Sequence, residues 1–340
     1  MKSNAPKAVW QGAALLGGAA LASKLIGTLQ KIPLQNLAGD RVFGLYSAVY
    51  ALAVMWMTLA AAGVPVAVSL LVAERHAAGD EAGARRVRRY ATALLSLTGL
   101  AAFAALQACA DTLAGWMGSP EAAAAIRTSS IALLVAPMTA AMRGYAQGRM
   151  EMLRPAVSQL LEQVARVAFM IVALLWALRQ AYGPASTAAA VHGGLAAGAA
   201  AGLVAMLLPI RRRRAGTSAS PKADVSAGGV PTYADAQERR SEPSPAPAPN
   251  ETGWPLVRRI AAVALPVAAG SVVAPLFGLI DAFTLPRLLQ HAGDSAAAAM
   301  TAFGEYNRGI ALLQLVAMAA GGAAAALVPA LTAARARGDA

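Results

Sequence analysis

Long runs of apolar residues alternate with short polar segments along most of the chain. Each run is at least about 20 residues long, the length that a helix needs to cross a bilayer. The pattern predicts an all-α polytopic membrane protein with about eight transmembrane helices, the first two joined by a polar outer turn over residues 30–42. The predicted spans cover residues 8–32, 43–73, 90–110, 124–146, 157–178, 186–208, 256–282 and 303–332.

This pattern stops between the sixth and seventh spans. Residues 211–252 open with four arginines and continue with Ser, Pro, Ala and Gly but almost no large apolar side chains. Such a composition cannot bury enough apolar surface to fold. We therefore expect a six-helix transmembrane lobe over 1–210, a disordered cytoplasmic linker over 211–254, and the first two helices of a second lobe over 255–340.

Spans one and two share an order of short motifs with spans seven and eight. The first pair reads KLIGTLQKIPL, then GD, then GLY, and the second reads LFGLIDAFTLP, then GD, then GEY. Transporters are often built from repeated bundles with the substrate site between them. The repeat predicts a second lobe, inverted or pseudo-symmetric to the first, which we expect to stop after two of its six helices.

Composition and charge agree with a membrane protein. Hydrophobic residues make up 57% of the chain and charged residues 14%, against about 25% charged in soluble domains. With the N-terminus inside, 21 of the 29 lysines and arginines lie in cytoplasmic segments and four in outer loops. This bias orients membrane proteins and accounts for the formal charge of +12. We expect a protein of the cytoplasmic membrane with both termini inside and no nucleic-acid partner.

The residues that would support redox, metal or hydrolytic chemistry are sparse. Cys109 is the single cysteine, and His76, His192 and His291 are scattered along the chain. Neither a disulfide nor a metal-ligand spacing results. No paired carboxylates suited to metal–phosphate chemistry occur. We expect no metal, no other cofactor and no catalytic residues, so the protein is not predicted to be an enzyme.

Four ionisable residues within or beside the spans are candidates for a substrate cavity. A charge inside lipid is costly and by default faces protein or water. Snorkelling of Lys24 to the outer interface is the competing interpretation of that residue, and a juxtamembrane anchor is the competing interpretation of Arg308. Lys24 and Arg308 are candidates on this ground, and Lys31 and Asp281 join them only through the family resemblance given below.

Two further sets of residues have structural interpretations. Glu162 and Arg166 are four residues apart, so they share a helix face and can neutralise each other. We interpret them as a structural ion pair, with a substrate contact as the alternative. Prolines inside spans remove helical hydrogen bonds, and those here are either functional hinges or plain kinks. They are Pro65, Pro137, Pro266 and Pro275.

Several stretches together resemble the polysaccharide-biosynthesis branch of the multidrug/oligosaccharidyl-lipid/polysaccharide exporter superfamily. They are SKLIGTLQKIPL, GVPVAVSLLVAE, RGYAQGRMEMLRPAVSQLLEQVARV and EYNRGIALLQLVAMAAGGAAAALVPAL. Within this branch the chain is most similar to the stage V sporulation protein B group and its relatives, the lipid II flippases once called virulence factor MviN. The resemblance covers everything except the linker.

The resemblance implies a fourteen-helix flippase with two six-helix lobes around a cationic cavity. The cavity would turn an undecaprenyl-linked sugar pyrophosphate outward by alternating access, for cell-wall, spore-cortex or polysaccharide synthesis. Lys24 stands where the family has a basic residue on the first helix, and Lys31 falls one place from another. Arg308 matches the cavity arginine of the eighth helix, and Asp281 matches an acidic residue late in the seventh. Membrane lipids and the cell-wall synthesis machinery are the implied partners.

The sequence departs from the lipid II flippases at one place, and it leaves two alternative functions open. The second helix is apolar through MWMTLAAAG, where the lipid II flippases place an arginine, which favours the sporulation-type branch over lipid II as substrate. A drug/cation antiporter of the same superfamily would need acidic residues deep in the spans, and here they lie near the ends. A non-transporting, truncated remnant is the second alternative.

Overall fold

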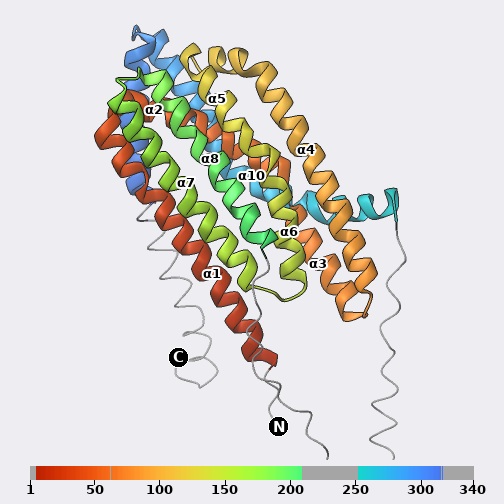
Figure 1. The fold of residues 1–340 in the computed structure, drawn as a ribbon. Helices are drawn as coiled ribbons and strands as arrows, with labels where there is room; N and C mark the ends of the chain where they lie inside the picture. Colours follow the sequence, from red (N-terminus) through yellow and green to blue (C-terminus); the bar gives the residue numbers. More distant parts are fainter. Residues whose placement is uncertain (1–4, 62, 209–251, 315, 317–340) are drawn as a thin grey trace, which may run out of the picture.

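The computed structural model describes residues 5–61, 63–208, 252–314 and 316, whose regular elements are all helices (Figure 1). This confirms the predicted all-α class. Most of the predicted linker and the end of the eighth span lie outside the described residues. The elements are α1 (Ala5–Leu29), α2 (Lys31–Ala61), α3 (Val64–Ala77), α4 (Glu81–Trp116), α5 (Ala123–Ser130), α6 (Ala136–Gly148), α7 (Leu153–Arg179), α8 (Pro184–Leu207), α10 (Trp254–His291), a helix over residues 296–314, and 3₁₀ turns at Pro120–Ala122 and Ile131–Leu134.

The first two membrane crossings meet at Gly39. This residue interrupts α2 with φ 80° and ψ 169°, a conformation that favours glycine, and the chain reverses there (Figure 1). The predicted polar turn over 30–42 is wrong because residues 31–38 are helical. Pro33 is tolerated within the first turn of α2, and Gln35 is covered by protein, being 8% exposed. The first crossing therefore reaches residue 38.

Six helical segments in the described part of the chain are long and apolar enough to cross a membrane. The first, Leu15–Ala77, has 63 residues. A straight helix of that length would measure about 95 Å, three times the thickness of the hydrocarbon core, so it makes two crossings. The helix over 296–314 begins the predicted eighth span. The arrangement agrees with about eight transmembrane helices.

Two predicted spans are broken at prolines. The second breaks between α2 and α3, where Gly63 has φ 70° and Pro65 lies in the first turn of α3. The fourth divides into α5, the 3₁₀ turn and α6, with Pro137 in the first turn of α6. A proline there lacks only an N–H that has no helical partner. Pro65 and Pro137 thus stand where one helix ends and the next begins, and their role as functional hinges or plain kinks stays a prediction. Pro266 and Pro275 do lie inside α10.

The helices α1–α8 form what we call the N-terminal bundle, and α10 with the helix over 296–314 forms the C-terminal pair. Within the bundle, α8 packs along α7, and α1 packs on the other side of α7. One buried apolar cluster joins the two parts. It includes Leu45 and Leu52 of α2, Leu106 of α4, Ile126 of α5 and Phe303 of the C-terminal pair.

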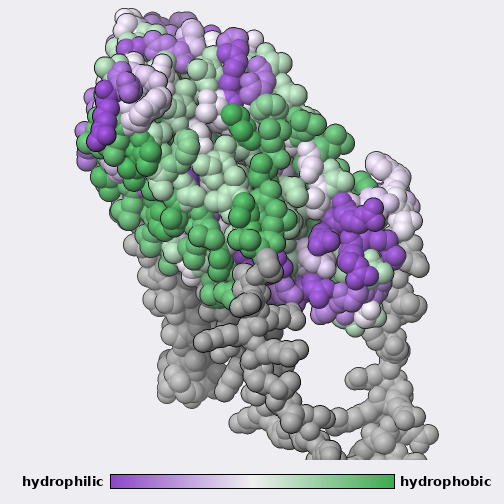
Figure 2. All heavy atoms as spheres, in the orientation of Figure 1, coloured by the Kyte–Doolittle hydropathy of each residue, from purple (hydrophilic) through white to green (hydrophobic). Residues whose placement is uncertain are grey.

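An apolar surface faces the surroundings between the two ends of the molecule. Figure 2 shows this green belt between hydrophilic groups at either end. Large apolar side chains of the long helices are exposed, among them Leu97 of α4 at 65% and Val172 of α7 at 67%. Large apolar side chains at such exposure belong in lipid. The protein is a multi-pass membrane protein.

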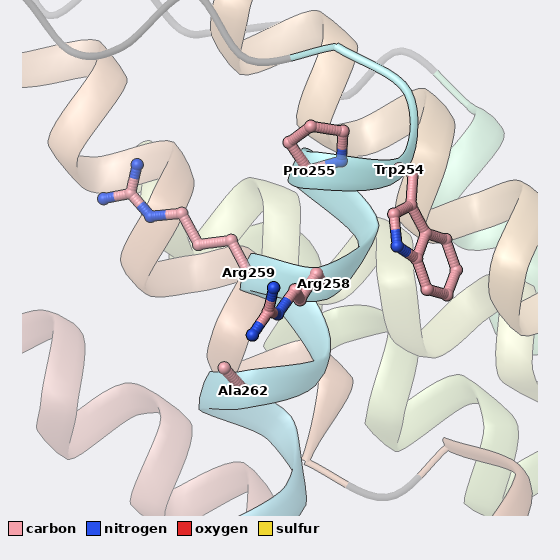
Figure 3. A pocket seen from close by; sticks show the side chains of 5 residues that line it. All are labelled: Trp254, Pro255, Arg258, Arg259 and Ala262. Atoms are coloured by element: carbon pink, nitrogen blue, oxygen red, sulfur yellow. The ribbon is translucent and has the colours of Figure 1, made fainter.

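The α3–α4 and α6–α7 connections lie at one end of the bundle, the lower end in Figure 1, which we call the basic end. The start of α10 lies there too, because Arg259 of α10 pairs with Glu74 of α3 at 2.9 Å. Trp254 is 75% exposed and lines a pocket of about 370 Å³ beside Arg258 (Figure 3). An exposed tryptophan beside a cation is typical of a membrane–water interface.

Candidate functional site

Two of the predicted cavity residues, Lys31 and Arg308, make contacts across the junction between the N-terminal bundle and the C-terminal pair. α10 packs along α2 and α3. The backbones of α2 and of the helix over 296–314 touch at Gly44 and Gly304. This contact lies toward the end opposite the basic end, and it positions the polar groups described next.

Arg308 forms an ion pair with Asp40, which follows the reversal at Gly39. The two side chains are 44% and 23% exposed. The pair joins residues that are 268 positions apart in the sequence, so it links the C-terminal pair to the first hairpin. Arg308 was expected to face the cavity as a cation for substrate. In this conformation its guanidinium group is engaged by a carboxylate of the protein.

Lys31 also reaches across the junction. Its ammonium group donates a hydrogen bond to Oε1 of Gln314 at 3.2 Å. Because residues 31–38 are helical, Lys31 belongs to the first membrane crossing and not to an outer loop. Lys31 therefore lies on the face of the first crossing that is directed toward the C-terminal pair.

Lys24 lies seven residues before Lys31. The backbone N–H of Gln30 still bonds to the carbonyl of Ile26 at 3.1 Å, so the helical path continues through this stretch. Lys24 belongs to α1 and Lys31 is the first residue of α2, with Gln30 as a turn residue between them. Lys24 is exposed, and its ammonium group has no hydrogen bond or ion pair within the described residues.

The depth of Lys24 bears on the snorkelling alternative. Fifteen residues separate it from the reversal at Gly39, which is about 22 Å along a helix. Nineteen residues separate it from Ala5, the first residue of α1, or about 28 Å. Snorkelling serves lysines near helix ends. Lys24 thus lies far from both ends of the first crossing, and among the described residues its ammonium group has no ionic partner.

Asp281 accepts a hydrogen bond from the hydroxyl group of Tyr306 at 3.0 Å. Both residues belong to the C-terminal pair, and Tyr306 is two residues before Arg308. The structure thus places Asp281, Tyr306 and Arg308 on neighbouring elements at the same end of the junction. Among the described residues, no cluster of His, Cys, Asp and Glu is suited to hold a metal ion.

Glu162 and Arg166 lie away from this junction, between helices of the N-terminal bundle. Glu162 accepts hydrogen bonds from Arg166 at 2.8 Å and from Arg143 of α6 at 2.7 Å. Arg143 also bonds to Ser158, whose hydroxyl group donates to the carbonyl of Gly202. The three charged side chains are 13–19% exposed. The network ties α6, α7 and α8 together.

Sequence reasoning missed three of these residues. Asp40 belongs to the repeated GD motif, but that motif suggested a turn and not a partner for Arg308. Tyr306 lies in the GEY motif that corresponds to GLY in the first hairpin. Arg143 ends a predicted span and was therefore counted only as a cytoplasmic charge.

Residues 9–227 match a family model described as polysaccharide biosynthesis protein, which covers more than half of the chain. The chain belongs to that family. The match includes α1–α8 and thus the whole N-terminal bundle. It confirms the resemblance that the sequence motifs carried.

Three proteins of Bacillus subtilis (strain 168) are similar to the chain. The uncharacterized membrane protein YabM is 29% identical over 94% of this chain and 55% of its own length. The lipid II flippase MurJ is 28% identical over 46% of this chain and 30% of its own length. Stage V sporulation protein B is 27% identical over 48% and 32%. The chain spans about half the length of the relative that it matches most extensively.

A solved structure supports the fold. An inward-facing multidrug resistance MATE family transporter of the MOP superfamily aligns with 82% of this chain and 60% of its own, with a TM-score of 0.51. The sequence identity is 16%, so the likeness concerns the fold alone. It agrees with a polytopic transporter architecture.

Proposed function

We propose that the protein takes part in moving an undecaprenyl-linked sugar pyrophosphate across the cytoplasmic membrane. The family and the names of the relatives, a lipid II flippase and a sporulation protein, support this class of substrate. The observation that carries the proposal is Lys24, a cation without a described partner inside an apolar crossing. A pyrophosphate headgroup needs fixed cations, which form charge-assisted hydrogen bonds with its oxygens.

The arrangement that we propose has two lobes, residues 1–210 and 255–340, with the linker over 211–254 between them. The headgroup would bind between the lobes, close to Lys24 and Lys31. Alternating access would then open one end of the junction while the other is closed. The contacts of Arg308 with Asp40 and of Lys31 with Gln314 support a closed junction at the end away from the basic end.

Binding of the headgroup tests the proposal. The purified chain in nanodiscs is titrated with fluorescent undecaprenyl-pyrophosphoryl sugar, comparing Lys24→Ala with Arg179→Ala, an exposed cation at the end of α7. Losing one charged hydrogen bond should weaken binding by about 10- to 100-fold for Lys24→Ala and leave Arg179→Ala unchanged. Lys24→Arg should retain binding. Equal affinities of Lys24→Ala and the unchanged protein would show that Lys24 does not bind the headgroup.

We further propose that the basic end faces the cytoplasm, following the charge bias. Single cysteines at Gln180 and Ala82, both exposed and on opposite ends, report on orientation in a Cys109→Ser background. An impermeant maleimide added to intact cells should label the cysteine at 180, and should label the one at 82 only after permeabilisation. The reverse pattern would invert the orientation.

A further inference from the structure

A second cationic pocket lies at the basic end, apart from the junction between bundle and C-terminal pair. It has a volume of about 210 Å³ and is lined by residues of α4, α6, α7 and α8. Arg88 comes from α4, Tyr145 from the last turn of α6, Arg154 from the first turn of α7, and Leu207 from the end of α8. The up-and-down order of these helices brings all four to the same end of the bundle.

Both arginines keep donors that the described protein does not fully use. The guanidinium of Arg88 lies over the ring of Tyr145, 5.0 Å from its centroid, and has no carboxylate partner within the described residues. Arg154 donates to the carbonyl of Met206 at 2.6 Å, but its Nε is buried without a hydrogen-bond partner. Buried donors are normally satisfied. An acceptor between the two side chains would satisfy them.

The nearby carboxylate of Glu151 is shared between arginines. Glu151 lies 3.8 Å from Nη1 of Arg154 and 3.7 Å from Nε of Arg149, so two arginines share it. These separations exceed hydrogen-bond distances. Two arginine forks facing one small cavity suit an anion with several oxygens, because guanidinium groups grip phosphate oxygens in pairs.

The volume of the pocket and the residues around it indicate which kind of phosphate compound it would bind. Its volume is below the roughly 300–1,000 Å³ of pockets for drug-sized ligands, so it suits a single phosphate group. The lining residue Leu207 is 58% exposed, and the sequence neighbours of the lining residues, Leu153 and Leu208, are 50% and 58% exposed. Those side chains suit acyl chains. Basic pockets between helices at this level of a membrane hold anionic lipid headgroups.

We propose that Arg88, Tyr145 and Arg154 form a site for the phosphate of an anionic phospholipid at the basic end. The ring of Tyr145 holds the Arg88 guanidinium in place, and Arg154 lines the same pocket from the first turn of α7. By binding to residues of α4, α6, α7 and α8, this lipid would hold the four helix ends together. The site is independent of the transported substrate, since none of its residues lies at the junction.

Native mass spectrometry of the purified chain tests the site. The chain is mixed with dioctanoyl phosphatidylglycerol, dioctanoyl phosphatidylcholine or inorganic phosphate. Arg88→Gln and Arg154→Gln are compared with Arg85→Gln, which removes an exposed cation from the same end of α4. Phosphatidylglycerol should bind best, and each pocket variant should weaken it at least about tenfold, the scale of one charged hydrogen bond. Arg85→Gln should bind it as the unchanged protein does.

Each other outcome overturns the proposal. If Arg85→Gln lost as much phosphatidylglycerol binding as the pocket variants, the lipid would be attracted to the basic surface as a whole and not to the pocket. Inorganic phosphate binding as tightly as the lipid would show a free-anion site, and equal binding of phosphatidylcholine would show that acyl chains alone decide. If Arg154→Gln fails to fold because its bond to Met206 is lost, Arg88→Gln still decides, since Arg88 has no such bond. Normal lipid binding by Arg88→Gln would refute the site.

Discussion

Gly44 of α2 and Gly304 of the C-terminal pair touch through their backbones, and the contact is reciprocal. A Cβ on Gly44 would lie 3.1 Å from the nitrogen of Gly304, and a Cβ on Gly304 would lie 3.1 Å from the nitrogen of Gly44. Each Cβ would also overlap the carbonyl oxygen four residues before the other glycine, that of Met300 or of Asp40. A two-fold axis that relates the two helices would produce a reciprocal contact of this kind.

The same two glycines open the GLY and GEY motifs of the repeat. Two residues after each glycine comes a tyrosine that bonds to a polar residue of the preceding helix. Tyr46 accepts from Gln30 at 3.4 Å, and Tyr306 donates to Asp281 at 3.0 Å. In both helix pairs the tyrosine after the glycine thus contacts a polar residue of the preceding crossing, which supports our proposal that residues from 255 onward begin a second lobe.

Replacing Gly44 by leucine should separate the two helices. The larger side chain cannot fit against the backbone of the C-terminal pair, and overpacking costs about 1–3 kcal/mol. Gly17→Leu is a matched control, because a Cβ there meets nothing within 4 Å. Thermal unfolding in detergent should show a lower Tm for Gly44→Leu than for Gly17→Leu. Equal Tm values would mean that the glycine contact does not stabilise the protein.

The sequence predicted the helices better than it predicted the contacts between them. Apolar runs with clear polar ends predicted spans 157–178 and 186–208, close to α7 and α8. The turn at 30–42 was misplaced because two of its polar residues, Gln30 and Gln35, are covered by protein and not by water. The ion pair of Asp40 and Arg308 could not be predicted from the local sequence, since the two residues are 268 positions apart. Such contacts depend on how whole helices pack.

Glu162→Gln should destabilise the N-terminal bundle. The carboxylate lies between Arg143 and Arg166, and its loss leaves two largely buried cations together. Breaking a buried ion pair in this way costs roughly 3–5 kcal/mol. Glu121→Gln removes the carboxylate of the exposed pair with Arg41 and should cost about 0–1 kcal/mol.

The comparison is made by thermal unfolding of both variants in the same detergent. A Tm of Glu162→Gln close to that of Glu121→Gln would contradict a stabilising role for the network. It would then favour the alternative in which Glu162 and Arg166 contact substrate, and headgroup binding by Glu162→Gln would become the next measurement.

Asp80 should stabilise the start of α4 in a pH-dependent way. Its carboxylate accepts a hydrogen bond from the N–H of Gly83 at 2.6 Å, and this bond, aided by Arg75, lowers the pKa of Asp80 below its ordinary value of 3.8. Because the folded state binds the proton less tightly, the contribution is complete above pH 3.8 and disappears as the pH falls through the lower folded pKa.

Asp80→Ala should therefore lower the Tm at pH 7, since removing such a helix cap costs about 0.5–2 kcal/mol. The difference in Tm between the variant and the unchanged protein should shrink when the pH is lowered below the pKa that Asp80 has in the folded protein. Thermal unfolding at both pH values measures it. A difference that stays constant with pH would show that the charge of Asp80 does not contribute.

The ion pair of Asp40 and Arg308 should act as a closure of the junction, so removing either partner should have the same effect. Ala48 is fully buried in the apolar cluster that includes Met300 and Phe303. In a Cys109→Ser background, a cysteine at position 48 should react with a maleimide faster when Asp40→Ala or Arg308→Ala is added. Arg41→Ala is the control, because it breaks a pair with Glu121 inside the N-terminal bundle.

The charge-swapped variant Asp40→Arg with Arg308→Asp distinguishes a closing pair from a substrate cation. If the pair closes the junction, the swap restores slow labelling, because the attraction survives the exchange. If Arg308 instead binds the pyrophosphate, Asp40→Ala leaves labelling slow and headgroup binding intact, while Arg308→Ala and the swap both lose binding. Arg308→Lys separates the two further. A lysine keeps the attraction to Asp40 but lacks the fork that grips phosphate oxygens in pairs, so slow labelling with weakened headgroup binding would assign Arg308 to the substrate.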